Sequence, residues 1–343
     1  MRRLRVPFAI ALVAVIVVGV IYWLRTRQRE VPTPFVTQGR LQIYALDVGQ
    51  GDSELIISPD GKSVLIDAGL PQAGDEVVAA LRKRNIKSLD LVVATHPHSD
   101  HIGGMRQVIE NFEVKNFLDS GQTYASNEYE RMLRAIKEKR IKFIEAKKGM
   151  TFDLGSGVKL ETLNPQGGGE WITKVRPGGS VENANSVVMR LSYGNFSMLF
   201  TGDAETETEQ IMMNAGEPLR AQVLKVGHHG SRYATSGKFL EAVAPEGAII
   251  SVGAGNRYGH PAEQTLDRLQ KAGVKIYRTD LNGETAIITD GNKFEIHAAK
   301  QPVQVAVWRR PVSAAPFAYM LSAVALSSKL GRRDGRRSQR RRL

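Results

Sequence analysis

The spacing of apolar positions predicts a folded body that begins near residue 40 with β-strands. Leu41–Leu46, Ser53–Ile57 and Ser63–Ile66 are short stretches in which apolar residues alternate with others or run together, as they do in strands. The Pro59–Gly61 segment lies between the second and third stretches and supplies residues that turns prefer. The body therefore opens with a β-rich hairpin arrangement.

Beyond residue 70 the pattern switches repeatedly between helical periodicity and short apolar runs of strand length. The predicted helices cover residues 75–84, 127–139, 206–215, 237–244 and 261–272. The further predicted strands cover residues 89–94, 142–144, 158–163, 186–191, 197–200, 221–226, 247–252 and 275–278. A last hairpin joins residues 285–289 to residues 293–297 through the Asp290-Gly291 turn. Strands come first and then alternate with helices, in two halves, which indicates an α+β fold.

The segment from residue 166 to residue 180 is rich in glycine and fits neither pattern. It is too long for a simple turn, and long segments without regular structure in compact domains are usually functional or unstructured. It is therefore predicted to be either a mobile loop or a rim around the functional site.

The first thirty residues contain an apolar run, Phe8–Leu24, with arginines on both sides. Its seventeen residues would span about 25 Å as a helix, at the short end of what crosses a bilayer. No small-residue cleavage site follows the run, so an uncleaved membrane anchor is favoured over a cleaved signal peptide. N-terminal anchors of this kind usually leave the catalytic body outside the cytoplasm, and we expect that location here.

Charge separates the two ends of the chain from its body. The net charge is +12, but residues 31–300 carry only −2, so the basic excess belongs to the termini and says nothing of the site. The chain has no cysteine, which is compatible with an oxidising compartment. We expect a signal or membrane-anchor segment at 1–30, a linker at 31–39, one folded domain at 40–298 and a basic, disordered tail at 299–343.

The strongest chemical signal is the stretch T-H-P-H-S-D-H-I-G-G, which follows a predicted strand. It places His96, His98, Asp100 and His101 within six positions, and three of the chain's seven histidines crowd into it. Imidazole and carboxylate together suit zinc, manganese or iron. The alternating pair of histidines and the adjacent Asp-His pair could serve two metal positions, which makes a chance cluster in a polar loop the weaker interpretation.

Three later segments could complete such a site, and each follows a predicted strand. Asp203, in Thr201-Gly202-Asp203, suits a ligand that bridges two metals, although it could also cap the next helix. His228 and His229 share a glycine-bracketed turn, in which one could bind metal and the other could donate a proton or contact phosphate. His260 is either a substrate contact or a structural residue at a helix start.

Together these segments resemble the metallo-β-lactamase superfamily over about residues 40–298. Within it they are most similar to the hydrolase domain attached to ComEC-type DNA-uptake channel proteins, here in a free-standing form. The segments that carry the resemblance are L-D-V-G-Q-G-D at 46–52, L-I-D-A-G at 65–69, H-P-H-S-D-H-I-G-G at 96–104, T-G-D at 201–203, G-H-H-G-S at 227–231 and Y-G-H-P at 258–261.

The resemblance implies a four-layer αββα sandwich with a two-metal site at one edge, between the sheets. His96 and His98 would hold one metal, Asp100 and His101 the other, and Asp203 would bridge them. His228 would be a further ligand, with Asp100 and His229 as the catalytic residues, although the roles of His228 and His229 could be exchanged. The residues expected to contact substrate or to orient the ligands are Asp47, Asp52, Asp67, Asn185, Ser231 and His260, with Asp67 orienting a ligand histidine.

One departure from the family pattern bears on the metals. Many superfamily members have another histidine between the first motif and the bridging aspartate, whereas this chain has none from residue 102 to residue 227. The corresponding position reads E-N-A-N-S at 182–186, where Asn185 would contact substrate or cap a strand. The first metal would have fewer ligands, which leaves either two divalent ions, zinc or manganese, or a single one.

The resulting functional expectation is a metal-dependent phosphodiesterase or nuclease in which a metal-bound hydroxide attacks phosphorus. DNA is the expected substrate and partner, and the N-terminal helix is the expected contact with the membrane. One alternative is a hydrolase of another envelope ester, such as a phosphocholine ester, a lactone or a thioester. A second alternative is an anchored, competence-like DNA-binding component whose hydrolase site is vestigial.

Overall fold

The structure, a computed structural model, describes residues 39–300. The predicted anchor at 1–30, nearly all of the linker and nearly all of the basic tail therefore lie outside the described residues. Within residues 39–300 no helix has both the length and the apolar character needed to cross a membrane.

The first of two large sheets has eight strands in the order β17-β16-β1-β2-β3-β5-β7-β8. Its strands are β1 (Leu41–Ala45), β2 (Glu54–Ile57), β3 (Ser63–Ile66), β5 (Leu91–Ala94), β7 (Asn116–Asp119), β8 (Lys142–Glu145), β16 (Thr285–Thr289) and β17 (Phe294–Ala298). Strands β3, β5, β7 and β8 are parallel. The last hairpin returns to this sheet, because β16 pairs antiparallel with β1 and sets Ile287 opposite Ile43.

The second large sheet has seven strands in the order β15-β14-β13-β12-β11-β10-β9. Its strands are β9 (Thr151–Asp153), β10 (Lys159–Asn164), β11 (Val188–Tyr193), β12 (Phe196–Phe200), β13 (Val223–Lys225), β14 (Gly247–Ile250) and β15 (Lys275–Arg278). Strands β12 to β15 are parallel, so their carboxyl ends share one edge of the sheet. A separate two-stranded sheet pairs β4 (Ser88–Leu89) with β6 (Glu113–Val114).

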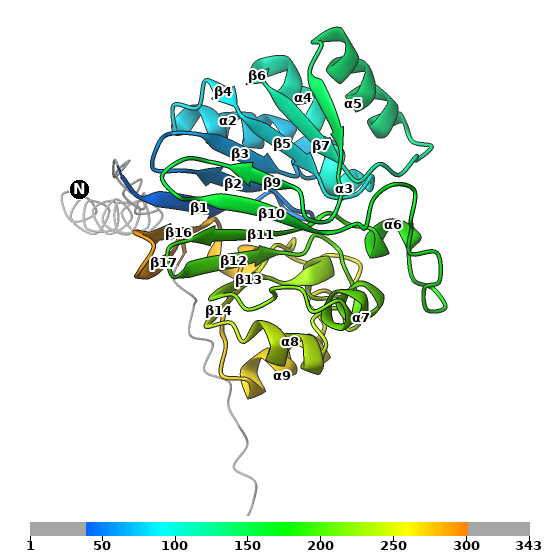
Figure 1. The fold of residues 1–343 in the computed structure, drawn as a ribbon, viewed down its shortest axis with the longest axis vertical. Coiled ribbons are helices and arrows are strands. Elements are labelled where there is room, and N and C mark those ends of the chain that lie inside the picture. Colours follow the sequence, from blue (N-terminus) through cyan, green and yellow to red (C-terminus); the bar gives the residue numbers. More distant parts are fainter. Residues whose placement is uncertain (1–38, 301–343) are drawn as a thin grey trace, which may run out of the picture. The chain divides into compact units, whose positions relative to one another are not determined.

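Helices cover the outer face of each sheet, as Figure 1 shows. The first sheet carries α2 (Gly74–Lys83), α4 (Met105–Asn111) and α5 (Asn127–Glu138), and the second carries α7 (Thr206–Asn214), α8 (Gly237–Val243) and α9 (Glu263–Lys271). The short helical segments are η1 (Pro71–Ala73), α3 (Ser99–Ile102), α6 (Val181–Ala184), η2 (Gly227–Gly230) and α10 (Thr279–Asn282).

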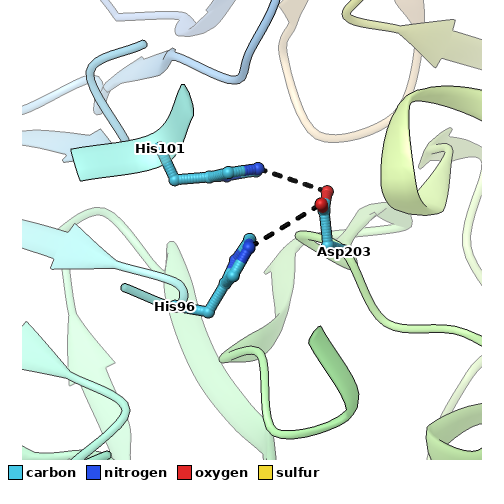
Figure 2. A group of neighbouring side chains, drawn as sticks. All are labelled: His96, His101 and Asp203. Atoms are coloured by element: carbon cyan, nitrogen blue, oxygen red, sulfur yellow. Dashed lines mark ion pairs between the residues drawn. The ribbon is translucent and has the colours of Figure 1, made fainter. Parts of the chain in front are cut away.

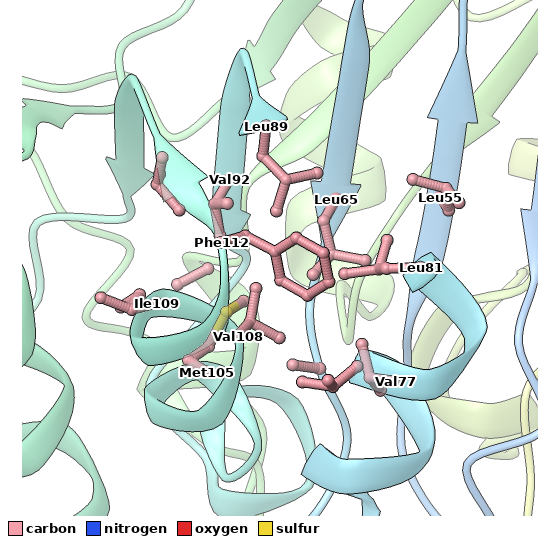
Figure 3. Packing of buried hydrophobic residues seen from close by; sticks show 14 of the residues in the cluster. Leu55, Leu65, Val77, Leu81, Leu89, Val92, Met105, Val108, Ile109 and Phe112 are labelled. Carbon is pink, nitrogen blue, oxygen red and sulfur yellow. The ribbon is translucent and has the colours of Figure 1, made fainter. Parts of the chain in front are cut away.

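Strand alternation distributes the apolar side chains over separate cores. In β3, Val64 and Ile66 point into the core between the two sheets, whereas Leu65 points toward the helices. Figure 3 shows Leu65 packed in the outer core beside Val77 and Leu81 of α2. A third core lies between the second sheet and its helices. Helix, sheet, sheet and helix thus stack in four layers, which confirms the predicted αββα sandwich.

Most predicted elements are present, and the exceptions are short. The predicted strand at 89–94 is split at Asp90, whose carboxylate accepts hydrogen bonds from the Ser63 backbone (2.9 Å) and the Lys115 ammonium (2.8 Å). Helix α4 and strand β7 were not predicted from the pattern. They have only seven and four residues, too few for a periodic signal to stand out.

A glycine lets the first loop approach the histidine motif closely. Gly51 has a φ of +127°, and a Cβ there would lie 2.2 Å from the carbonyl oxygen of Asp100. The same approach allows the Asp52 backbone N–H to donate to that carbonyl at 3.2 Å. The backbone at Gly51 therefore fixes the distance between two segments that carry candidate site residues.

We predict that Gly51→Ala destabilises the protein by about 3 kcal/mol, since a strained φ and a steric clash act together. Gly49→Ala is the matched control, because Gly49 also has a positive φ (+70°) but a Cβ added there would meet nothing within 4 Å. That control is expected to cost about 1 kcal/mol. Urea unfolding followed by circular dichroism measures both values, and equal losses would contradict the close-approach argument.

Candidate metal centre

The candidate site lies where the carboxyl ends of strands from both sheets meet. Each contributing segment directly follows a strand: Asp67 follows β3, Thr95–His101 follows β5, Thr201–Asp203 follows β12 and Gly227–Ser231 follows β13. Loops at the carboxyl ends of parallel strands converge on one edge, which is where α/β proteins place their ligands. The topology therefore assembles residues that lie up to 164 positions apart in the sequence.

Asp67 ties the first motif together from beneath. It is fully buried with a φ of +57°, and its carboxylate accepts hydrogen bonds from the backbone N–H (2.8 Å) and the hydroxyl (2.6 Å) of Thr95. It also accepts from Nδ1 of His101 at 2.7 Å. This last bond fixes the tautomer of His101 and leaves its Nε2 directed toward the centre of the cluster.

Asp203 lies at the centre of four histidines. One carboxylate oxygen is 3.3 Å from Nε2 of His101 and 3.5 Å from Nε2 of His229. The other is 3.7 Å from Nε2 of His96 and 3.6 Å from Nε2 of His228. Figure 2 shows His96 and His101 directed at this carboxylate. Such a central position is the one that a bridging carboxylate needs.

His229 is the inner histidine of the G-H-H-G-S turn. It is buried, its Nδ1 donates to the carbonyl oxygen of Ser251 at 2.9 Å, and its Nε2 lies 3.3 Å from the Asp100 carboxylate. Burial alone would lower its pKa, but the negative charges of Asp203 and Asp52 outweigh burial and raise the pKa to about 10. Without a metal this ring therefore carries a proton at neutral pH.

His228 is the outer histidine of the same turn. About a quarter of its side chain is exposed (26%), and its Nδ1 donates to Glu205 at 2.8 Å. The hydroxyl of Ser231 donates to the same oxygen of Glu205, also at 2.8 Å. Burial opposes ionisation of Glu205, but the bond from His228 prevails and lowers the carboxyl's pKa. His228 is thus oriented by a carboxylate while one edge faces the exterior.

The backbone of the turn explains why neighbouring histidines take different roles. His228 (φ +44°) and His229 (φ +51°) both adopt the left-handed conformation, which costs roughly 1–3 kcal/mol for each non-glycine residue. The His228 backbone is held by hydrogen bonds to Gly202 (3.1 Å) and from Ser231 (2.7 Å). The turn therefore sends one ring into the carboxylate cluster and leaves the other at its edge.

His96 and His98 lie next to each other on the opposite flank. Nε2 of His96 is 3.1 Å from Nδ1 of His98, and the His98 ring meets Tyr124 edge-on with ring centres 5.6 Å apart. His96 is fully buried, and burial together with the neighbouring His101 lowers its pKa well below the usual value. His96 is therefore neutral and able to bind a metal at neutral pH without losing a proton.

The described residues offer four groups of side chains that could hold a metal ion, and each contains at least one predicted ligand. In the group Asp52-Asp67-His101 the carboxylate of Asp67 is already bonded to His101, which leaves three other groups. The groups, each with ligand atoms within 4.8 Å of one another, are His96-His101-Asp203, Asp100-His101-His229 and Asp52-Asp203-His229. His98 and His228 belong to no such group among residues 39–300. Asp52 was expected to play a supporting role and His229 a catalytic role. Both instead have side-chain atoms close enough to those of the other residues to bind a metal directly.

The donor atoms themselves fit a divalent cation. His101 Nε2, His229 Nε2, Asp203 Oδ1 and Asp52 Oδ1 are all buried, and none has a hydrogen-bond partner in the described part of the chain. Buried polar atoms are almost always paired, so a group of them that converges is unusual. Imidazole nitrogen and carboxylate oxygen are the donor set that zinc and manganese accept.

A buried lysine lies beneath the cluster, and sequence reasoning missed it. The ammonium of Lys225, only 1% exposed, lies 2.6 Å from the Asp52 carboxylate and donates to the carbonyl oxygen of Val226 at 3.0 Å. Burial disfavours the charged lysine, but Asp52 and Glu54 more than compensate and raise its pKa. The signal in the sequence was a lysine inside the apolar strand directly before the histidine turn.

Glu205 and Asn183 were also missed. The amide nitrogen of Asn183 lies 3.3 Å from Nδ1 of His228, the same ring nitrogen that donates to Glu205. Both residues stand within two positions of predicted site residues, in E-N-A-N-S and T-G-D-A-E. Proximity to a motif was therefore the available signal for each of them.

The remaining predicted residues take supporting or distant positions. Asn185 is fully buried, and its amide bonds to the backbone of Ile172 in the glycine-rich segment and to the carbonyl oxygen of Val181 at the start of α6. His260 meets the His228 ring edge-on at 5.3 Å, and burial lowers its pKa to about 4. Asp47 is exposed and faces Lys300 at 3.8 Å, so the structure does not bring it into the cluster.

Two helix-covered sheets with a histidine and aspartate cluster at their shared edge define an αββα protein with a candidate metal site. The family model of the Metallo-beta-lactamase superfamily matches residues 46–254, and the chain belongs to this superfamily.

Curated relatives point to a narrower group. The chain is 32% identical over 259 residues to ComE operon protein 3 of Bacillus subtilis, covering 71% of this chain and 32% of that protein. It is 32% identical over 251 residues to competence protein ComA of Neisseria gonorrhoeae, covering 72% of this chain and 32% of that protein. A shorter match, 30% over 74 residues, links it to exodeoxyribonuclease YycJ of Bacillus anthracis, covering 22% and 28%. The chain thus spans about a third of the competence proteins that it matches.

We predict that metal binding at pH 7 releases about two protons. The imidazoles of His101 and His229 have raised pKa values and are protonated, and each must lose a proton before its nitrogen can bind a metal. Apparent affinity should therefore rise as pH increases from 7 toward 9, where protons compete less. Calorimetric titration with manganese in buffers of different ionisation enthalpy counts the released protons. His260→Gln is the control and should release the same number, since His260 is already neutral. Binding without proton release would contradict the charge assignment.

Proposed function

We propose that this protein is a metal-dependent hydrolase that cleaves phosphodiester bonds of DNA. The observation that carries the proposal is the convergence of buried side-chain atoms of His101, His229 and Asp203 at the carboxyl edge of both sheets. The two imidazole nitrogens lie 3.3 Å and 3.5 Å from the carboxylate oxygen, yet none of these atoms forms a hydrogen bond in the described part of the chain. A site built only for structural stability would pair these atoms with each other or with the backbone.

The ligand set that we propose follows the distances. His96, His101 and Asp203 would hold one divalent ion, and Asp100, His229 and Asp52 or Asp203 would hold a second. This assignment exchanges the roles of His228 and His229, an exchange that the sequence left open. His98 remains a proposed ligand of the first ion through its contact with His96.

A phosphodiester substrate is supported by charge and by relatives. Bound divalent ions would turn a carboxylate-rich cluster into an anion-binding site, and the guanidinium of Arg176 is paired with Glu205 at its rim. The segments that resemble DNA-uptake hydrolase domains, together with the match to a protein named as an exodeoxyribonuclease, favour DNA over other phosphodiesters.

The chain's own residues would divide the work as follows. A divalent ion bound at this position would lower the pKa of a coordinated water molecule. It would also stabilise the negative charge that develops on a phosphoryl oxygen. Asp67 holds His101 in the tautomer that binds through Nε2. His228, oriented by Glu205 and partly exposed, is positioned to donate a proton to the leaving oxygen.

We predict that the full-length protein hydrolyses bis(p-nitrophenyl) phosphate and single-stranded DNA when manganese or zinc is present, and that chelation abolishes both activities. The Asp100→Ala, His101→Ala double variant should lose metal and activity together. Release of p-nitrophenol and gel analysis of labelled DNA provide the measurements. Activity confined to lactones or thioesters would overturn the phosphodiesterase proposal. DNA binding without hydrolysis, retained by the double variant, would instead support a vestigial site.

A second experiment should distinguish the roles of His228 and His229. We predict that His229→Gln lowers the bound metal, measured by elemental analysis of the purified protein, because its Nε2 belongs to the cluster. His228→Gln should keep the metal and lower kcat about a hundredfold, as expected for loss of a general acid. The opposite result, with metal lost only in His228→Gln, would restore the assignment in which His228 is the ligand.

A further inference from the structure

Two exposed tyrosines lie on the turns that carry the outer histidines of the site. Among the described residues, the large apolar or aromatic side chains that remain exposed are Phe143, Tyr233, Tyr258 and Leu281. Tyr233 comes two positions after the G-H-H-G-S turn, and Tyr258 comes two positions before His260. Isolated exposed aromatics are ordinary, but two of them from separate turns at one site call for an explanation.

Tyr258 is connected to the site through stacked rings. Its side chain is 53% exposed, and its ring stacks on His260 with centres 6.1 Å apart and planes 19° apart. The His260 ring in turn meets His228 edge-on. Tyr258 therefore extends outward from the histidine that we propose as the proton donor.

Tyr233 is connected to the same histidine through charged groups. It is 44% exposed, and the guanidinium carbon of Arg176 lies 3.6 Å from the centre of its ring. Arg176 forms an ion pair with Glu205, which accepts the hydrogen bond from His228. Arg176 comes from the glycine-rich segment, so that segment forms part of the rim.

Each tyrosine is accompanied by further positive charge. The guanidinium carbon of Arg257 lies 5.2 Å from the Tyr258 ring centre, and that of Arg232 lies 5.8 Å from the Tyr233 ring centre. Residues 31–300 carry a net charge of only −2, so the affinity of this body for a polyanion depends on where its cations stand. Here arginines gather with exposed aromatic rings beside the proposed phosphodiesterase site.

We propose that Tyr233 and Tyr258 form a base-stacking surface that holds unpaired nucleotides of single-stranded DNA beside the scissile phosphodiester. Aromatic faces and guanidinium planes stack on bases without reading their sequence, while arginines neutralise phosphates. Bases in a duplex are already stacked on each other, so such a surface selects single strands. The inference rests on the proposed function, because it assigns the substrate form for that site.

The test compares two strands of equal charge. Full-length protein is titrated with a labelled thymidine oligonucleotide and with an abasic oligonucleotide of the same length, in chelator so that neither is cut. Fluorescence anisotropy should show at least tenfold tighter binding of the strand that carries bases. Tyr233→Ala and Tyr258→Ala should each reduce this preference by about tenfold, whereas their affinity for the abasic strand should change little.

Matched variants separate stacking from general damage. Tyr233→Phe and Tyr258→Phe keep the ring and should retain the preference for bases. Phe143→Ala removes an aromatic of similar exposure (43%) that stacks instead on Phe117, and it should leave the preference unchanged. Equal wild-type affinity for the two strands, or an unchanged preference in both alanine variants, would overturn the stacking surface.

These measurements distinguish failure of the stacking surface from failure of the proposed phosphodiesterase function. Hydrolysis of bis(p-nitrophenyl) phosphate and DNA with no preference for bases would leave the phosphodiesterase standing and overturn the stacking surface. A preference for bases that depends on the tyrosines, in a protein without any hydrolytic activity, would support the surface and overturn the enzyme.

Discussion

The structure depends on accommodating three carboxyl groups in its interior. Asp52, Asp67 and Asp203 are almost completely inaccessible to solvent, and an ionised carboxylate without partners would be very costly there. Lys225 compensates Asp52, and His101 lies between Asp67 and Asp203. Removing one partner of a buried ion pair typically costs about 3–5 kcal/mol, so a substitution of one of these residues leaves its partner as a destabilising buried charge. The cluster is balanced by protons when no cation is bound and leaves donor atoms ready for one.

This charge balance explains why the contributing residues come from the ends of neighbouring strands. Asp67, Asp203 and the two histidines of the turn lie just beyond the ends of β3, β12 and β13, so their backbones are held near the sheet while their side chains enter the gap. Asp52 instead lies in the loop before β2. Asp67 shows the arrangement most clearly, since its backbone N–H donates to Val93 at 2.9 Å and its carboxylate receives two bonds from Thr95. The β3–β5 pairing thereby sets the position of His101. A sheet is a rigid support, and a site on strand ends is more exactly placed than one on free loops.

Much of this architecture could be predicted from the sequence, because amphipathic helices leave periodic signals, because most strands form apolar runs between turn residues, and because the histidine motif is dense. The contact of Asp67 with a histidine of the motif was expected from its place in the family pattern. Lys225 did not, since a lysine in an apolar strand becomes meaningful only when Asp52, 173 positions earlier, is seen beside it. The order of His228 and His229 was also undetermined, because spacing cannot reveal two successive left-handed residues that send adjacent rings in different directions. Ion pairs between distant segments, and backbone strain that the tertiary structure maintains, leave no signal in the local sequence pattern.

The left-handed turn gives one strand end two functions. If His228 and His229 had ordinary extended conformations, alternation would point their side chains to opposite faces, and one would leave the site. The strained conformation instead keeps both rings within 3.6 Å of Asp203, one fully buried and one at the rim. The inner ring, that of His229, faces carboxylates that would bind a cation together with it. The outer ring faces Glu205 and His260, and through them the exposed tyrosines. Backbone strain at this turn therefore joins the buried charge cluster to the surface on which a polymer substrate would lie.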